Sequence, residues 1–357
     1  MHHPDVCIAG AGIIGLSLAL ELHRRGLHVT VLDRALPLAE ASTAAAGMLA
    51  AHDPHNPPGL QPLADLSLSL YPAFLHRLGQ LSGIEVPYQT HAAIQRDVAR
   101  PSRLHHAVSK DQLDQLLPGN TLDNRDFHLI DEPSVDPRQL AIALLVAVQA
   151  TSIQLLPNTS LLAANYSEAA TIAVSTSAGT IDAATFVDCT GAWAASGNLP
   201  VVPVKGQMLA VSLPTALPLE IVLRTPDIYI VPRTSGPNVG RAIIGATIED
   251  AGFDKTVHLA DIAHLRSRAA ALLPSLAAAP QLEAWAGLRP ATPDGLPLLG
   301  ALPGHPNHLL ATGHYRDGIL LAPATALLMA QVLSGETPSI DLTPFSPMRT
   351  ALQRITP

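Results

Sequence analysis

Residues 5–15 read DVCIAGAGIIG, and the chain begins to show its fold here. The apolar start, Asp5–Ala9, predicts a short strand, and a glycine-rich turn follows at once. Gly10 permits a tight turn, Gly12 lets the backbone approach a pyrophosphate, and Gly15 lets the next helix pack closely on the strand. The N–H groups that begin this helix can face an anion, because they have no partner within the helix. The stretch therefore predicts the first turn of a dinucleotide-binding unit.

The residues after the turn complete the unit. Polar side chains recur at helical spacing up to Arg25, and Gly26 fits the position just after a helix. Residues 28–32 predict a second strand that ends at Asp33, where an acid can accept hydrogen bonds from ribose hydroxyls. The alternative is a coincidental turn in a chain rich in Ala and Gly, but all the parts stand at the expected distances. The unit predicts a bound dinucleotide and does not distinguish FAD from NAD.

A stretch of small residues, 41–49 (ASTAAAGML), follows the second strand. Small side chains there leave room for a second, bulkier half of a cofactor. The stretch also fits the start of a helix capped by Ser42 or Thr43, and the two interpretations are compatible.

Composition limits the function classes. The chain has 357 residues, 48% of them hydrophobic and 14% charged, which suggests about two or three domains of a globular protein. The longest apolar run, 319–333, contains Pro323 and is too short to cross a bilayer, so we expect no membrane anchor. The net charge of −8 argues against a nucleic-acid partner.

The cysteines and histidines of the sequence further limit the kinds of site that are expected. Cys7 and Cys189 are the only cysteines, and each lies in an apolar stretch, so neither a disulfide framework nor a thiolate metal site is expected. The histidines are scattered, and we expect no metal site. The N-terminus lacks the features of a signal peptide, so a cytoplasmic location is expected.

Later segments predict more of the sheet and then a second one. Asp136-Pro137 fits the start of a helix that runs to Ala150, and a hairpin is expected around residues 177–179. A strand over 185–189 then returns to the small-residue turn Thr190-Gly191, as a nucleotide-binding sheet does when it revisits its ligand. From residue 201 onward, short β-type runs separated by Pro and Gly predict an antiparallel sheet.

The C-terminal third contains the two most specific segments, WAGLRPATPDGLP (285–297) and TGHYRDGILLAPAT (312–325). Together with residues 44–49 and VKGQ (204–207), they resemble the glycine oxidase, or thiamine-biosynthetic, branch of the D-amino acid oxidase superfamily. The resemblance runs over nearly the whole chain in the same order.

The resemblance implies an α/β fold in which a Rossmann-like FAD-binding domain of the glutathione-reductase type carries an inserted α+β substrate domain built on an antiparallel sheet. The expected FAD-binding domain is discontinuous and consists of residues 1–85, 134–200 and 286–340. The expected substrate domain consists of residues 86–133 and 201–285, and residues 341–357 form a C-terminal tail.

The resemblance also implies a set of cofactor contacts. These are Gly10, Gly12, Ile13, Ile14, Gly15, Asp33, Arg34, Ser42, Thr43, Ala46, Gly47, Met48, Leu161, His314, Tyr315, Arg316, Asp317, Gly318, Ile319 and Leu320. FAD is expected to be non-covalent, since sarcosine oxidase relatives use a late cysteine as tether and none follows Cys189. Three residues depart from the family: Asp33 where Glu is usual, Tyr315 where Phe is common, and Asp317 where Asn is common, which changes the charge near the flavin.

Substrate contacts are implied at Arg289, Tyr229 and Arg316. A guanidinium binds a carboxylate through two hydrogen bonds, and a buried Arg in an apolar chain needs an anion. The alternatives are that Arg289 forms a structural salt bridge, that Arg316 supports the loop that covers the flavin instead of binding the substrate, and that Tyr229 is a core aromatic residue. A helix expected from Gly318 would stabilise negative charge on the flavin with its N-terminus, with Pro323 tolerated near the first turn.

The function implied is FAD-dependent oxidation of glycine, or of sarcosine or a small D-amino acid, to the imine and glyoxylate. O2 would be reduced to hydrogen peroxide, and the product would feed thiamine thiazole biosynthesis. No residue is assigned as general base. A homo-oligomer, by resemblance a tetramer, is expected. The alternatives are a flavin dehydrogenase that passes electrons to a quinone, and a non-catalytic nucleotide-binding protein.

Overall fold

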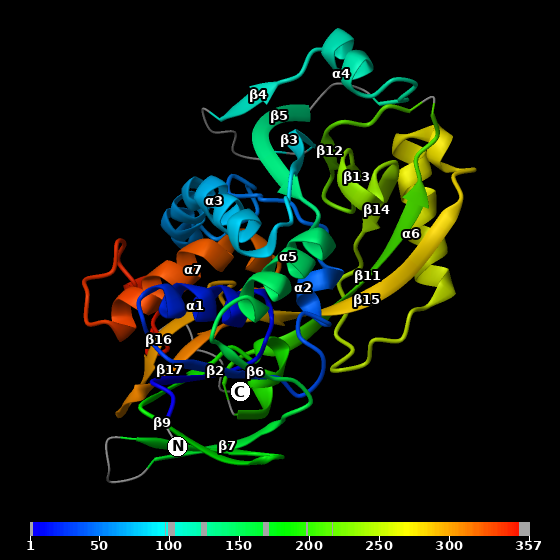
Figure 1. Ribbon diagram of the computed structural model, residues 1–357. Helices are drawn as coiled ribbons and strands as arrows, with labels where there is room; N and C mark the ends of the chain where they lie inside the picture. The colour runs from blue at the N-terminus through cyan, green and yellow to red at the C-terminus, as the bar shows by residue number, and fades with distance from the viewer. Residues whose placement is uncertain are drawn as a thin grey trace.

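The computed structural model describes residues 3–96, 98, 104–122, 127–166, 171–197, 199–215 and 217–349. Three sheets organise them, with the six-stranded and three-stranded sheets in the lower half of Figure 1 and the eight-stranded sheet above and to the right. No helix in this part of the chain is both long and apolar enough to cross a membrane. Residues 350–357 of the expected tail lie outside the described residues.

The six-stranded sheet is built around the predicted unit. Its strand order is β16-β17-β10-β1-β2-β6, and only β16 runs antiparallel to its neighbour. The strands are β1 Val6–Ala9, β2 Val29–Leu32, β6 Gln154–Leu156, β10 Thr185–Asp188, β16 Leu298–Leu302 and β17 His305–Thr312. The return of β10 beside β1 confirms the predicted revisit of the turn.

Helices cover one face of this sheet (Figure 1), and the three-stranded sheet lies against the other. The helices are α1 Ile13–Arg24, α3 Gln61–Ser82, α5 Pro137–Gln149 and α7 Gly318–Leu333. The small sheet is β7 Leu161–Tyr166, β8 Ile172–Thr176 and β9 Gly179–Ala183. The hairpin predicted around residues 177–179 and the Asp136 cap, which accepts from the Arg138 N–H, are both confirmed.

The eight-stranded sheet draws on residues from between the segments of the first sheet. Its strand order is β15-β11-β14-β13-β12-β3-β5-β4. The strands are β3 Tyr88–Arg96, β4 His105–Ala107, β5 Phe127–Val135, β11 Val202–Ser212, β12 Val222–Arg224, β13 Tyr229–Arg233, β14 Arg241–Gly245 and β15 Gln281–Ala291. The predicted α/β fold is confirmed. The second sheet, expected to be antiparallel, is mixed, because β12 pairs with β3 in parallel while the other neighbouring strands of the sheet run antiparallel. The domain limits stay a prediction, and β15 continues past residue 285, where the second domain is expected to end.

The remaining helices of the described residues are three α-helices and five short 3-10 helices. The α-helices are α2 Ala41–Ala44, α4 Lys110–Leu116 and α6 Leu259–Leu272. The 3-10 helices are Pro58–Leu60, Gly191–Gly197, Gly236–Asn238, Pro274–Leu276 and Thr343–Phe345. The caps expected at Ser42 or Thr43 are wrong, because both lie inside α2, whose N-cap is Glu40. The Ser42 hydroxyl instead accepts from the Ile13 N–H at 2.9 Å and caps α1, whose own N-cap, Gly12, has no side chain.

Pro323 is tolerated for a different reason from the one expected. It is the sixth residue of α7, beyond the first turn, and its ring removes the N–H that the Ile319 carbonyl would accept. Tyr71 of α3 donates its hydroxyl to that carbonyl at 2.7 Å. Ser67, one turn earlier on α3, donates to the Leu320 carbonyl at 2.6 Å and accepts from the Ala324 N–H at 3.1 Å. Two buried hydroxyls of α3 therefore satisfy the backbone of α7 around the proline.

Replacing Ser67 by Ala tests this support. The change removes a buried partner from a carbonyl and an N–H, and we expect it to lower the free energy of unfolding by about 1–3 kcal/mol. Urea denaturation measures the loss. The matched control is Ser69→Ala on the same helix, where the hydroxyl is exposed and a change below about 0.5 kcal/mol is expected. Equal losses in the two variants would contradict the assignment.

Candidate active site

One large cavity, of about 890 Å³, lies where the two larger sheets meet. Its wall includes the residues that directly follow β1 and β2 and those that end β10 and β17, and the carboxyl ends of parallel strands are where such sheets bind ligands. The same cavity extends to β11, β13 and β15 of the eight-stranded sheet. The fold thus brings the predicted nucleotide end and the predicted substrate residues to one space.

The glycine turn has the geometry that the sequence predicts. Gly10 has φ +103°, and a Cβ there would overlap the carbonyl of Cys189. A Cβ on Gly15 would overlap the Gly10 carbonyl, so this glycine serves helix–strand packing. At Gly12 the nearest atom is the Ser42 hydroxyl, 3.4 Å from a built Cβ, and the turn stays open to a ligand.

Asp33 ties the second strand to this turn. Its carboxylate accepts from the Ala11 N–H at 2.8 Å and from the Ala35 N–H at 2.9 Å, and the residue lines the cavity. Next to it, the Arg34 guanidinium lies 3.6 Å from the centre of the Trp193 ring and donates to Glu40 at 2.8 Å. Trp193 was not predicted. It follows the small-residue turn Thr190-Gly191, and that turn was the only available signal.

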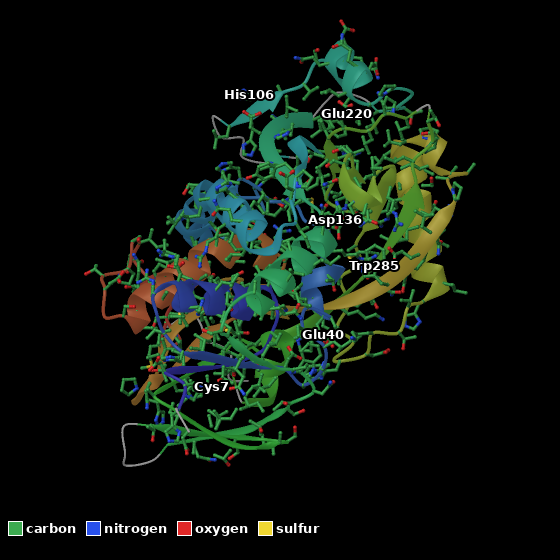
Figure 2. The ribbon with its side chains drawn as sticks, viewed as in Figure 1. Cys7, Glu40, His106, Asp136, Glu220 and Trp285 are labelled. Carbon is green, nitrogen blue, oxygen red and sulfur yellow. The ribbon has the colours of Figure 1, made fainter. Side chains whose placement is uncertain are left out.

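The segment 44–48 is held by three strands of the eight-stranded sheet. Trp285 of β15 donates its indole N–H to the Ala44 carbonyl at 3.0 Å, and Arg233 of β13 donates to the Ala46 carbonyl at 2.8 Å. Trp285 lies beside α2 (Figure 2). Gly47 has φ +89°, and a Cβ there would overlap the carbonyl of Val135, the last residue of β5. The position of this segment therefore depends on the eight-stranded sheet.

Residues 314–319 line the cavity at the start of α7. His314 is buried, its Nε2 lies 3.1 Å from the Thr325 hydroxyl, and burial lowers its pKa to about 3, so the ring is neutral at physiological pH. Asp317 is the N-cap of α7 and is 8% exposed. Burial raises the pKa of Asp317 to about 7, with Asp53 and Glu132 adding to the shift and the charges of Arg316 and Arg224 opposing it. The departure from Asn noted in the sequence thus places a titratable carboxyl in this wall.

Arg289 and Tyr229 each lie directly against a glycine, Gly206 and Gly245 respectively. A Cβ on Gly206 would overlap the Arg289 guanidinium, and a Cβ on Gly245 would overlap the Tyr229 hydroxyl. Arg289 donates to the carbonyls of Lys205 and Thr247, at 3.3 and 3.2 Å, and no acidic side chain of the described residues pairs with it. The partial burial of Tyr229 raises its pKa, and the charge of Arg289 opposes the rise. The salt-bridge alternative for Arg289 finds no partner in the described chain, and its charge is available to a ligand.

Arg316 has a partner. It donates to the Asp53 carboxylate at 3.3 Å and to the Asn56 side chain at 3.2 Å, and it lines the same cavity. Asp53 was not predicted, since the Pro-rich loop that holds it has no motif. Arg224, also missed, lines the wall nearby and is buried.

Most predicted residues come together. Those that line the cavity are Gly10, Gly12, Ile13, Ile14, Asp33, Arg34, Ser42, Ala46, Gly47, Met48, Leu161, Tyr229, Arg289, His314, Tyr315, Arg316, Asp317, Gly318 and Ile319. Gly15, Thr43 and Leu320 are not brought to the wall. Thr43 donates its hydroxyl to the Leu38 carbonyl, and Leu320 is buried in the core under α3. Among the described residues, no three side chains of the metal-binding types form a group that could hold a metal ion.

The residues present fit a dinucleotide with a large second half. The open turn at Gly12 and the start of α1 suit a pyrophosphate, and the carboxylate of Asp33 suits a ribose. Small side chains at 44–47 and the start of α7 leave a broad space between the two sheets. A nicotinamide needs less room than this space provides, and an isoalloxazine ring suits it. The fold and the cavity define a flavin-dependent oxidoreductase with a binding place for a small anion.

Comparison with known proteins gives the family. Residues 5–332 match the family described as DAO, FAD dependent oxidoreductase, and the chain belongs to it. The chain is 38% identical over 362 residues to the bifunctional protein ThiO/ThiG of Synechocystis sp., covering 97% of this chain and 54% of that protein. It therefore spans about half the length of the ThiO/ThiG relatives that it matches.

Single-function relatives are matched over their whole length. The glycine oxidase of Pseudomonas aeruginosa is 34% identical, with 96% of this chain and 98% of that protein covered. The crystal structure of glycine oxidase from Geobacillus kaustophilus matches with a TM-score of 0.88 at 31% identity, covering 98% of this chain and 99% of that one. The resemblance predicted from the motifs is confirmed, and FAD is the cofactor of the family.

Asp317→Asn tests the buried carboxyl at the start of α7. With a pKa raised from 3.8 to about 7, the folded protein binds more protons than the unfolded chain between these pH values, so this group lowers stability as the pH rises through them. We expect the variant to gain more free energy of unfolding at pH 8 than at pH 4, by about 1.4 kcal/mol per pKa unit of the shift. Urea denaturation at the two pH values measures the gain. The control is Asp182→Asn, at an exposed carboxyl outside the cavity wall, and an equal gain at the two pH values for Asp317→Asn would contradict the prediction.

Proposed function

We propose that this protein oxidises glycine, and also sarcosine or small D-amino acids, to the imine, with O2 reduced to hydrogen peroxide. The imine hydrolyses to the corresponding 2-oxo acid, which is glyoxylate for glycine and sarcosine. The observation that carries the proposal is Arg289, a cation without an acidic partner among the described residues, placed with Tyr229 in the cavity that begins at the dinucleotide turn. Relatives named glycine oxidase, similar over nearly their whole length, support the choice of substrate.

The chain's own residues account for binding and orientation. Arg289 binds the substrate carboxylate through its guanidinium, a stronger contact than a Lys ammonium provides because two parallel hydrogen bonds form. Its hydrogen bonds to the carbonyls of Lys205 and Thr247 hold the guanidinium plane in place. The Tyr229 hydroxyl, over Gly245, adds a second contact on the same side.

FAD supplies the redox chemistry when bound, accepting a hydride from the substrate Cα and delivering two electrons to O2. We propose that the glycine turn and Asp33 hold its ADP half, with Arg34 and Leu161 beside the adenosine. Residues 42–48 and 314–319 would surround the ring. The start of α7 would stabilise negative charge there. Burial lowers the pKa of His314 to about 3, so its ring is a poor proton acceptor and we assign it no role as a general base; none is needed if the substrate amine arrives neutral.

The setting of the reaction is part of the proposal. The name ThiO/ThiG of the longer relatives supports a role in supplying the imine to thiamine thiazole biosynthesis. We also propose a cytoplasmic location, in keeping with two free, buried cysteines, Cys7 and Cys189. A homo-oligomer, by resemblance a tetramer, is proposed as well, and light scattering after size exclusion tests it.

Substitution of Arg289 tests the substrate site. We expect Arg289→Lys to raise the KM for glycine about tenfold, because Lys lacks the two parallel N–H donors of the guanidinium. We expect Arg289→Leu to raise it about a hundredfold, because Leu carries no charge. Peroxide release under air and flavin reduction under nitrogen measure the two variants. The control is Arg24→Lys on the exposed side of α1, with KM unchanged. An unchanged KM in Arg289→Leu, or wild-type flavin that glycine and sarcosine leave oxidised, would overturn the proposal. Rapid dye reduction under nitrogen with slow peroxide release under air would instead favour a quinone-linked dehydrogenase.

Gly206→Ala tests whether the close packing of Gly206 against Arg289 positions the guanidinium. The added methyl would overlap the Arg289 guanidinium, so the guanidinium must shift. We expect a rise in KM for glycine of about tenfold or more with FAD still bound, since a small displacement of a binding group is costly. Steady-state kinetics and the flavin absorbance spectrum measure the two effects. In the control, Gly79→Ala within α3, the built Cβ lies 3.8 Å from its nearest neighbour, and KM should not change.

A further inference from the structure

Four arginines line the cavity, and they differ in their partners. Arg34 lies at the adenosine end and pairs with Glu40. Arg224, 5% exposed, donates to both oxygens of Glu132, at 2.5 and 3.1 Å, and to Gln95. Arg316 pairs with Asp53. Within the described chain, Arg289 is thus the lining arginine that lacks an acidic partner.

Asp53 is held firmly in its place. Its side chain is 9% exposed, and its Oδ1 accepts from the His55 N–H at 2.9 Å and lies 3.0 Å from the His55 ring nitrogen. The Gln95 amide lies 3.4 Å from the same oxygen. Burial favours the neutral acid, but the charges of Arg224 and Arg316 and the hydrogen bonds from His55 lower the pKa of Asp53 to about 2. The carboxylate is therefore ionised at any working pH, and its Oδ2 faces Arg316.

Arg316 and Arg289 belong to neighbouring segments of the wall. The Tyr315 N–H donates to the Pro290 carbonyl at 2.8 Å, which joins the residue before Arg316 to the residue after Arg289. Both arginines line the same cavity. A ligand with two carboxylates that bound Arg289 through one of them would, on turning the other toward Arg316, meet a place that Asp53 already fills.

We propose that Asp53 is a specificity-determining residue: it occupies Arg316 as an internal carboxylate, so that the site accepts amino acids with one carboxylate, bound by Arg289, and rejects those with a second. The inference rests on the proposed function, because it assumes that Arg289 binds the substrate carboxylate. Rejection has two sources, which are the lack of a free second cation and the repulsion between Asp53 and an incoming anion.

Two ligands that lack an amine test the proposal by binding alone. Methoxyacetate has the shape of sarcosine with one carboxylate, and diglycolate has the shape of iminodiacetate with two. Their dissociation constants for the holoenzyme are measured from the change in flavin absorbance. For the wild type we expect diglycolate to bind about tenfold more weakly than methoxyacetate, or weaker still.

The Asp53→Asn variant keeps the size of the side chain and removes its charge. We expect diglycolate to bind at least about tenfold more tightly than to the wild type, because the charge of Arg316 is no longer balanced by the Asp53 carboxylate, while methoxyacetate changes less than about threefold. The ratio of kcat/KM for iminodiacetate to that for sarcosine should rise in parallel. In Asp53→Asn combined with Arg316→Met the gain should disappear. A gain that persists without Arg316, or no gain at all, overturns the proposal.

Two further variants guard the interpretation. Asp227→Asn removes another carboxylate of the cavity wall, one that is exposed and pairs with Arg268, and it should leave diglycolate binding unchanged. An equal gain there would mean that net charge alone decides, and would overturn the proposal. Arg316→Met alone leaves Asp53 without the charge of Arg316, so we expect the binding of diglycolate to weaken relative to that of methoxyacetate. The opposite change would count against the proposal. This arm remains informative if Asp53→Asn does not fold.

Failure of the proposed function would look different. In that case wild-type enzyme would oxidise neither glycine nor sarcosine, methoxyacetate would not bind, and this inference would fall with it. If methoxyacetate binds and requires Arg289, but the Asp53 and Arg316 variants do not change the preference between the two ligands, only the role of Asp53 is overturned.

Discussion

The attachment of residues 44–49 to the eight-stranded sheet is the constraint on which the active site depends. This segment hydrogen-bonds to β13 and β15 through Arg233 and Trp285, and to the end of β5, where the Val135 N–H donates to the Gly47 carbonyl. There is no room for a side chain at Gly47. Leu49, at the end of the segment, packs in the same hydrophobic core as β1 and α1, so the segment links the eight-stranded sheet to the dinucleotide unit, and the dinucleotide turn and the substrate arginine open into one cavity rather than two.

Charge balance along the wall follows from this arrangement. An apolar protein can bury guanidinium groups only where an anion or polar groups receive them. Glu132 pairs with Arg224 and Asp53 pairs with Arg316, whereas Arg289 donates to two backbone carbonyls and has no acidic partner among the described residues. Carbonyl dipoles orient the group without cancelling its charge, and the remaining attraction is available to a substrate carboxylate.

Much of the fold could be predicted from local signals. The glycine turn, the Asp136 cap and the hairpin at 177–179 depend on neighbouring residues, and they formed as predicted. Long-range partners were harder to foresee. Ser42 caps α1 rather than its own helix, and Pro323 is accommodated by two hydroxyls from α3, because in both cases the partner comes from a distant part of the chain.

The sequence by itself determined the α/β fold, the dinucleotide unit and the family, since these depend on spacing along the chain and on motifs of several residues. It also named Arg289, Arg316 and Tyr229 of the site, but not Arg224. Only the tertiary structure decided which arginine is free. The acid that pairs with Arg316 lies 263 positions away in a loop without a motif. Gly206 and Gly245 come to lie under Arg289 and Tyr229 only when β11 and β14 are paired. Charge pairing and close backbone approach are properties of distance in space, and residue order does not encode them directly.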